Sequence, residues 1–160
     1  MDEVVRIGIA EYAVSQKPII LRTAGLGSCV GVIIYDQERG LSSMAHVMLP
    51  DSAISRNIAL EIGKFADTAV VELTRRLRHS GAIRLRAKIA GGAQMFQFKY
   101  EHESMRIGER NIAAVKLALR KANVPLVAED VGGTNGRTIE FHSQTGRLVI
   151  RTVNVGTLEI

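Results

Sequence analysis

The chain has little cysteine, few aromatic residues and no tryptophan. A single cysteine in 160 residues cannot form an internal disulfide, so nothing in the sequence indicates an oxidising compartment. Aromatic residues make up 4% of the chain, which argues against a platform that stacks nucleic-acid bases. One Cys and four dispersed His offer no close pair of metal ligands, so a zinc site is disfavoured as well. We expect no metal, no cofactor and no nucleic-acid partner.

Long apolar runs are also missing. No run approaches the ~18 residues of a membrane-spanning helix. The N-terminus carries the acidic residues Asp2 and Glu3 where a secretory signal would carry basic side chains. An apolar fraction of 46% is ordinary for a globular protein, and 160 residues are about one domain. The sequence therefore predicts a single domain over residues 1–160, cytoplasmic and without membrane insertion.

Acidic residues are fewer than basic ones, and the formal net charge is +5. The densest basic stretch lies between Arg75 and Lys88. Basic side chains late in a helix complement the helix dipole, which is the simplest interpretation of this stretch.

Hydrophobic patterning predicts a strand-rich chain with two helices. Segments 62–77 and 109–122 have apolar residues at the i, i+3, i+4, i+7 spacing of amphipathic helices. Short apolar or alternating segments bounded by turn residues predict the strands, which are 5–9, 19–23, 29–35, 41–49, 83–90, 124–128, 137–142 and 147–153. Several neighbouring strands are close enough in sequence to form hairpins. This order predicts an α+β fold in which a mixed, largely antiparallel sheet, or sheets, is covered by two long helices.

One predicted hairpin brings together two residues that could carry chemistry. If Tyr35 pairs with Gly40 across the turn, the antiparallel register places Cys29 directly opposite His46. Directly opposed residues have Cβ atoms about 4.5–5.5 Å apart, close enough for a thiol and an imidazole to interact. A slip of one residue would move one of them to the other face of the sheet.

A glycine-rich turn precedes Cys29. A tight reversal over residues 24–28 would bring Thr23 beside Cys29 and near His46. Glycine permits the positive φ that such a turn needs, and successive amides near Gly27 and Ser28 could converge on an anion. That arrangement is what an oxyanion hole requires. As a phosphate-binding loop the segment is weaker, because it lacks the GK[ST] ending.

These residue types are those of a cysteine nucleophile with a base. A free thiol is mostly protonated at neutral pH, so an adjacent imidazole must take its proton. Thr23 could orient the imidazole through its hydroxyl or its backbone carbonyl. Spacing alone leaves another interpretation open. A lone cysteine in an apolar strand is commonly a small buried hydrophobe, and a lone histidine commonly bonds a backbone group.

Six sequence blocks resemble, in order, the motifs of the CheD family of chemotaxis proteins. The block around the cysteine, LGSCV at 26–30, is similar to the family signature. The others are AHVMLPDS at 45–52, FADTA at 65–69, IAGGAQMF at 89–96, IGERN at 107–111 and AEDVGG at 128–133. Together they extend over almost the whole chain. The resemblance implies that the stretch 97–106 is longer than the corresponding stretch of the family, and we expect an exposed loop there.

The resemblance implies a fold, an activity and partners. The implied fold is a compact α/β sandwich related to the catalytic domain of a bacterial cytotoxic necrotizing factor. The implied activity is hydrolysis of selected Gln side chains on methyl-accepting chemoreceptors to Glu. The family's catalytic Cys, His and Thr fall on Cys29, His46 and Thr23. The implied partners are the receptors and CheC, a phosphatase of the response regulator CheY.

Two other functions stay open at this point. The chain could act chiefly as a regulatory module that binds CheC and stimulates its phosphatase activity. It could also perform a related acyl transfer, as a transglutaminase or a thiol amidase acting on small amides.

Overall fold

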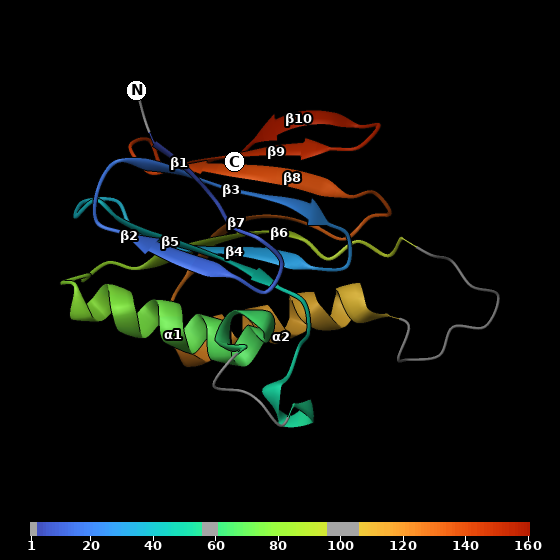
Figure 1. Cartoon of the computed structure of the whole chain (residues 1–160), viewed down its shortest axis with the longest axis horizontal. Helices are drawn as coiled ribbons and strands as arrows, with labels where there is room; N and C mark the ends of the chain where they lie inside the picture. Colours follow the sequence, from blue (N-terminus) through green and yellow to red (C-terminus); the bar gives the residue numbers. More distant parts are fainter. Residues whose placement is uncertain (1–2, 56–60, 96–105) are drawn as a thin grey trace.

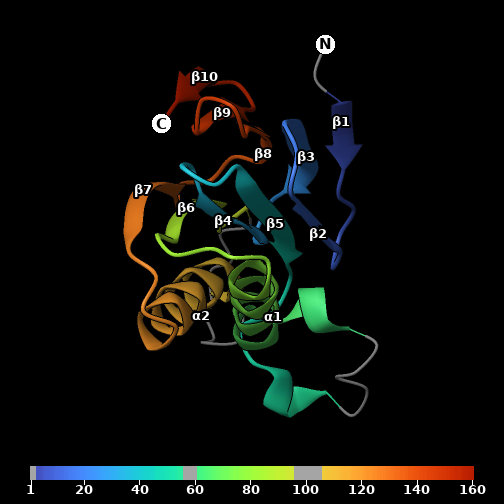
Figure 2. The same cartoon turned by 90° about the vertical axis from the view of Figure 1, so that its left-hand side faces the viewer.

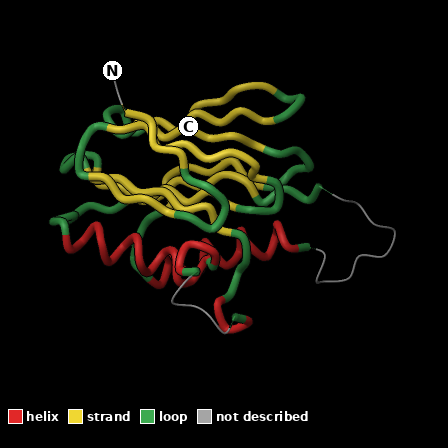
Figure 3. Tube along the Cα trace, viewed as in Figure 1, coloured by secondary structure: helices red, strands yellow, loops and turns green. Residues whose placement is uncertain are grey.

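A computed structural model describes residues 3–55, 61–95 and 106–160. Within these ranges the strands form two five-stranded sheets, and two long helices cover one of the sheets (Figure 1, Figure 3). The predicted α+β class, with two helices over largely antiparallel sheets, is confirmed.

The first sheet contains both ends of the described chain. Its spatial order is β1, β3, β8, β9 and β10. Their bounds are Glu3–Arg6, Ile19–Leu26, Arg137–His142, Arg147–Thr152 and Gly156–Glu159. Only β1 and β3 run parallel, and the other neighbours are antiparallel.

The second sheet lies in the middle of the molecule. Its order is β2, β5, β4, β6 and β7, with bounds Tyr12–Ser15, Leu41–Val47, Val30–Asp36, Arg86–Gly91 and Leu126–Val131. Helices α1, Ala66–His79, and α2, Ile107–Lys121, lie side by side beneath it (Figure 2). Within the described residues, the short 3-10 turns Ser52–Ile54 and Ile62–Lys64 precede α1.

Strands β4 and β5 are buried at every position because they are covered on both faces. Val30, Val32 and Ile34 pack toward the helices, in one hydrophobic core. Ile33 and Tyr35 point the other way, into a second core between the two sheets. This explains why β4 reads as a nearly continuous apolar run rather than as an alternating one.

The predicted register of the β4–β5 hairpin is wrong by two residues. Tyr35 pairs with Ser42, and His46 lies opposite Gly31 instead of Cys29. The turn consists of the four residues 37–40, because Asp36 still pairs with Leu41. A shift of two residues keeps every side chain on its face, so Cys29 becomes a diagonal neighbour of His46 rather than a direct one.

Other boundaries also differ from the expectation. Strand β3 continues past Thr23 to Leu26, although its register shifts there, and the predicted turn is correspondingly shorter. The short strands β2 and β10 were not predicted. Helix α1 begins at Ala66, not at residue 62, because a 3-10 turn occupies 62–64. Of the stretch 97–106, only Arg106 lies within the described residues, so the expected loop falls outside them.

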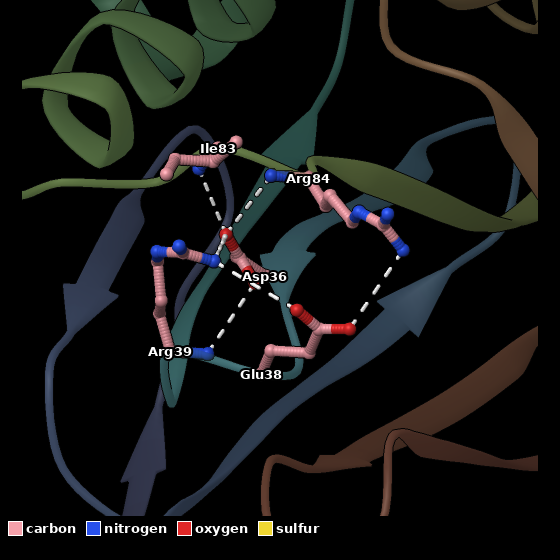
Figure 4. Close-up of polar contacts among 5 residues, drawn as sticks. All are labelled: Asp36, Glu38, Arg39, Ile83 and Arg84. Atoms are coloured by element: carbon pink, nitrogen blue, oxygen red, sulfur yellow. Dashed lines mark hydrogen bonds and ion pairs between the residues drawn. The ribbon is translucent and has the colours of Figure 1, made fainter.

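A buried carboxylate holds the β4–β5 turn at the opposite end of β4 from Cys29. Asp36 Oδ2 accepts hydrogen bonds from the backbone N–H groups of Ile83, at 2.9 Å, and Arg84, at 3.0 Å. Its Oδ1 accepts one from the Arg39 N–H at 3.3 Å (Figure 4). Burial acts to raise the pKa of Asp36, but these amides and the Arg39 guanidinium outweigh it. The pKa therefore lies below its ordinary value.

Candidate active site

Strand ends from both sheets meet at one end of the sandwich, the right-hand end in Figure 1. The β3–β4 loop, the end of β5, the end of β6 and the beginning of α2 all lie there. This is where the structure brings Thr23, His46 and Cys29 together from separate segments.

Thr23 and His46 are joined by a hydrogen bond that crosses from one sheet to the other. The distance from Thr23 Oγ1 to His46 Nδ1 is 2.7 Å, and both side chains are buried. Thr23 Oγ1 also lies 2.6 Å from the carbonyl oxygen of Ile7. Because a carbonyl only accepts, the hydroxyl donates its one hydrogen to Ile7. It must then accept the bond from Nδ1–H of His46.

This arrangement selects one tautomer of His46. With the proton on Nδ1, the neutral ring presents an unprotonated Nε2. Nε2 is buried and has no hydrogen-bond partner within the described residues. Burial also lowers the pKa of His46, which keeps the ring neutral. The imidazole is therefore oriented and protonated as a proton acceptor should be.

The backbone of His46 is fixed by the loop that follows β1. The His46 N–H donates to the Glu11 carbonyl at 3.0 Å, and the His46 carbonyl accepts from the Ala10 N–H at 3.0 Å. Sequence reasoning missed this loop and the Ile7 carbonyl. Backbone groups leave no trace in residue identity, so no signal in the sequence could have found them.

Cys29 immediately precedes β4 and is partly buried at the margin of the core between the sheets. Burial raises the pKa of its thiol, so the resting side chain is protonated and needs a base to become a nucleophile. Its sulfur is not hydrogen-bonded to Nε2 of His46, which has no partner in the described structure. The two residues are diagonal neighbours across the ends of β4 and β5, and their side chains are not hydrogen-bonded to each other.

The carbonyl groups of the loop 27–29 are all held inside the protein. The Gly27 carbonyl accepts from the Ala93 N–H at 2.8 Å, and the Cys29 carbonyl accepts from the Gly92 N–H at 2.8 Å. The carbonyl between them, of Ser28, accepts from Nδ2 of Asn111 at 3.0 Å. A trans peptide points its N–H away from its C=O, so inward carbonyls imply outward amides.

Two amides of this loop are free to bind a ligand. The Gly27 N–H already donates to the Gly25 carbonyl at 3.1 Å. By contrast, the N–H groups of Ser28 and Cys29 donate to no group in the described part of the chain. Adjacent free amides next to a thiol can stabilise a negative oxygen formed on the carbon that the sulfur attacks.

Glycine is required where β6 approaches this loop. Gly91 has a φ of +114°, and a Cβ there would lie 2.3 Å from the Cys29 carbonyl oxygen. At Gly27 a Cβ would lie 2.7 Å from the sulfur of Met95. The Gly91–Gly92 pair thus ends β6 and also supports the loop that carries Cys29.

Asn111 is a site neighbour that sequence reasoning did not single out. It is fully buried in α2, four residues before Val115 and eight before Leu119 on the buried face. A polar residue in register with an apolar stripe was a signal that could have found it.

Among the described residues, no group of three or more His, Cys, Asp or Glu could hold a metal ion. None of the described helices is long and apolar enough to cross a membrane.

Comparison with known proteins identifies the family. The family model described as CheD chemotactic sensory transduction matches residues 48–152. A chemoreceptor glutamine deamidase CheD of Halalkalibacterium halodurans is 52% identical, over 100% of this chain and 100% of that protein. Proteins of the same name from Bacillus licheniformis, at 46% identity, and Bacillus subtilis, at 45%, cover 98% and 96% of this chain and 95% and 93% of their own lengths. The chain belongs to the CheD family.

Proposed function

We propose that the chain is a glutamine deamidase of bacterial chemotaxis, which converts selected Gln side chains of methyl-accepting chemoreceptors to Glu and releases ammonia. Its nucleophile is Cys29, its general base is His46, and Thr23 orients the base. The observation that carries the assignment is the hydrogen bond between Thr23 and His46, which leaves a buried Nε2 unpartnered beside the Cys29 loop. The full-length relatives named as chemoreceptor glutamine deamidases support the substrate.

The first half of the reaction forms a thioester. Nε2 of His46 takes the thiol proton as the Cys29 sulfur attacks the side-chain carbonyl carbon of the substrate Gln. The negative oxygen that develops is stabilised by the N–H groups of Ser28 and Cys29. The protonated His46 then gives its proton to the departing nitrogen, so that ammonia leaves and a γ-glutamyl thioester remains.

The second half consumes water. Neutral His46 takes a proton from a water molecule as that water attacks the thioester carbonyl. The same amides hold the oxyanion, and the thiolate leaves and recovers the proton from His46. Water and the Gln amide give Glu and ammonia, and each residue returns to its starting state. The steps need no metal and no cofactor.

Gly27 supports the site without donating to the oxyanion in this proposal. Its amide is occupied, and its lack of a side chain leaves room for Met95. Substrate binding is assigned to the outer surface of the loop that contains Gly27 and Ser28, where a helix of the receptor can lie. The enzyme then acts in the cytoplasm, where the receptor signalling helices are.

CheC is the second proposed partner, taken from the family resemblance alone. Regulation of CheC and deamidation are separable, because only deamidation requires the thiol. If Cys29→Ala still stimulates CheC but leaves the receptor unmodified, the wild-type chain has both functions.

Mass spectrometry of a purified receptor cytoplasmic fragment tests the main proposal. Each deamidated Gln adds about one dalton, since NH₂ is replaced by OH, and peptide fragments locate the site. Wild-type protein should produce this shift, and Cys29→Ala should not. Full deamidation by Cys29→Ala, with its fold intact by circular dichroism, would show that the nucleophile is misassigned. Activity on free glutamine at the same rate would favour a small-amide hydrolase instead.

A further inference from the structure

One buried side chain touches both catalytic segments and has no role in the mechanism above. Asn111 is 0% exposed and projects from the second turn of α2. Its Nδ2 donates to the Ser28 carbonyl at 3.0 Å and to the Met48 carbonyl at 2.9 Å. Its Oδ1 is buried and has no partner among the described residues. The carboxamide is therefore held in the site by its two donated bonds.

The first of these bonds fixes a peptide plane that matters for the chemistry. The Ser28 carbonyl and the Cys29 N–H belong to the same peptide unit, and the described chain contains no cis peptide. In a trans unit the C=O and the N–H point in opposite directions. Because Asn111 turns the carbonyl toward α2, the Cys29 N–H must point away from α2, and it has no partner in the described structure.

The second bond reaches the segment that carries the base. Met48 lies two residues after His46, just beyond the end of β5. One nitrogen thus joins the residue before the nucleophile to the segment after the base. No other described side chain donates to both segments.

We propose that Asn111 is a positioning residue for deamidation, which aims the Cys29 amide N–H at the oxyanion by holding the Ser28 carbonyl inward. The inference rests on the proposed function and adds to it the group that orients the oxyanion hole. Since the oxyanion exists only in the transition state and the tetrahedral intermediate, the loss of this group should lower kcat and leave KM little changed.

Two reactions of the same sulfur separate this role from simple structural support. Deamidation passes through a tetrahedral oxyanion, whereas alkylation by iodoacetamide displaces iodide at a saturated carbon and forms none. Cys29 is the one cysteine of the chain, so the label is unambiguous. Asn111→Ala should reduce kcat on a receptor fragment by about a hundredfold, as expected for one lost oxyanion donor, with alkylation within about twofold of wild type.

Val115→Ala is the matched control. Val115 lies one turn further along the same buried face of α2, and its truncation loosens the same packing without touching the Cys29 loop. Under conditions in which circular dichroism shows that every variant is folded, Val115→Ala should keep the kcat of wild type. If Asn111→Ala does not fold, Asn111→Asp preserves the volume and donates at most one of the two bonds, so its kcat must still fall.

Several results would overturn the inference. They are an unchanged kcat in both Asn111 variants, a raised KM with unchanged kcat, and a parallel loss of deamidation and alkylation. Failure of the proposed function looks different, because wild-type protein fully alkylated on Cys29 would then still deamidate the receptor.

Discussion

At the scale of single residues, the Thr23 hydroxyl decides which nitrogen of His46 is free. The hydroxyl donates its one hydrogen to the Ile7 carbonyl, so its oxygen can only accept the hydrogen bond from Nδ1–H of His46. Sequence reasoning identified Thr23 and His46 but left open whether the hydroxyl or the backbone carbonyl makes the contact. The structure shows that the hydroxyl makes it.

Thr23→Val and Thr23→Ser form a matched pair for testing this contact. Valine keeps the shape of the side chain and removes the hydroxyl, so Nδ1 loses its acceptor and the ring can adopt the other tautomer. We expect a kcat lower by roughly ten- to a hundredfold for valine, a smaller loss than for His46→Ala. Serine keeps the hydroxyl and should stay near wild type. Equal activity of the valine and serine variants would contradict the orienting role.

The pH dependence of Cys29 reactivity is the second prediction at this scale. Burial raises the pKa of Cys29 and lowers the pKa of His46, so the resting pair is a neutral thiol and a neutral imidazole. The alkylation rate of Cys29 by iodoacetamide should therefore still be rising above the ordinary thiol pKa of about 8.5, where a free cysteine has already passed its midpoint. A rate that is already at its plateau between pH 5 and 7 would instead indicate a preformed thiolate–imidazolium pair.

At the scale of secondary-structure elements, β4 links the Cys29 loop at one end to Asp36 at the other. The carboxylate of Asp36 bonds the turn before β5 to the segment leading into β6. These contacts are about 23 Å from Cys29 along the strand, given ~3.3 Å per residue. Asp36 therefore supports stability and not chemistry.

Asp36→Asn should lower the free energy of unfolding at pH 7 by on the order of 2 kcal/mol, because a charged acceptor of several bonds becomes a neutral one. The folded pKa of Asp36 is depressed, so its contribution is complete above the unfolded value of about 3.9 and disappears as the pH falls through the folded value. In urea denaturation, the difference in the free energy of unfolding between wild type and Asp36→Asn should become smaller below about pH 4. The kcat of the folded variant should be unchanged, and a constant gap down to pH 2 would contradict the assignment.

The elements that the sequence predicted well are those with strong patterns. Helix α2 was expected over 109–122 and is found at Ile107–Lys121. Strands β2 and β10 were missed because each has four residues, and β10 is exposed throughout. The hairpin register was wrong because hydrophobic patterning fixes the face of a strand but not the number of residues in its turn. Gly40, with a φ of +65°, lies in the turn as predicted but does not pair with Tyr35.

At the scale of the whole molecule, the site depends on how closely the two sheets pack. Gly31 lies opposite His46 and faces the other sheet, where a Cβ would come within 2.5 Å of Ile139 Cδ1. The packing of one sheet on the other joins residues more than a hundred positions apart in the chain. No local pattern contains that information, so Thr23 and His46 could be proposed as neighbours from sequence but not placed in separate sheets.

Gly31→Ala should push the sheets apart beside the base, with a loss of about 1–3 kcal/mol of stability and a reduced kcat. Ile139→Val removes the Cδ1 atom that the new methyl group would meet. The double variant should therefore recover part of both losses, and a double-mutant cycle in urea measures the coupling. Additive effects of the two substitutions would show that the sheets do not compress each other at this point.

The hydrogen bond between Thr23 and His46 also sets the order in which activity can arise during synthesis. Strand β3, which presents Thr23, is paired in its sheet with β8, and β8 begins only at Arg137. A nascent chain that stops before this strand carries the thiol and the imidazole but has not built the sheet that orients them. Truncated translation products should therefore be unable to deamidate a receptor, and a competent enzyme forms only once β8 has been added to the first sheet.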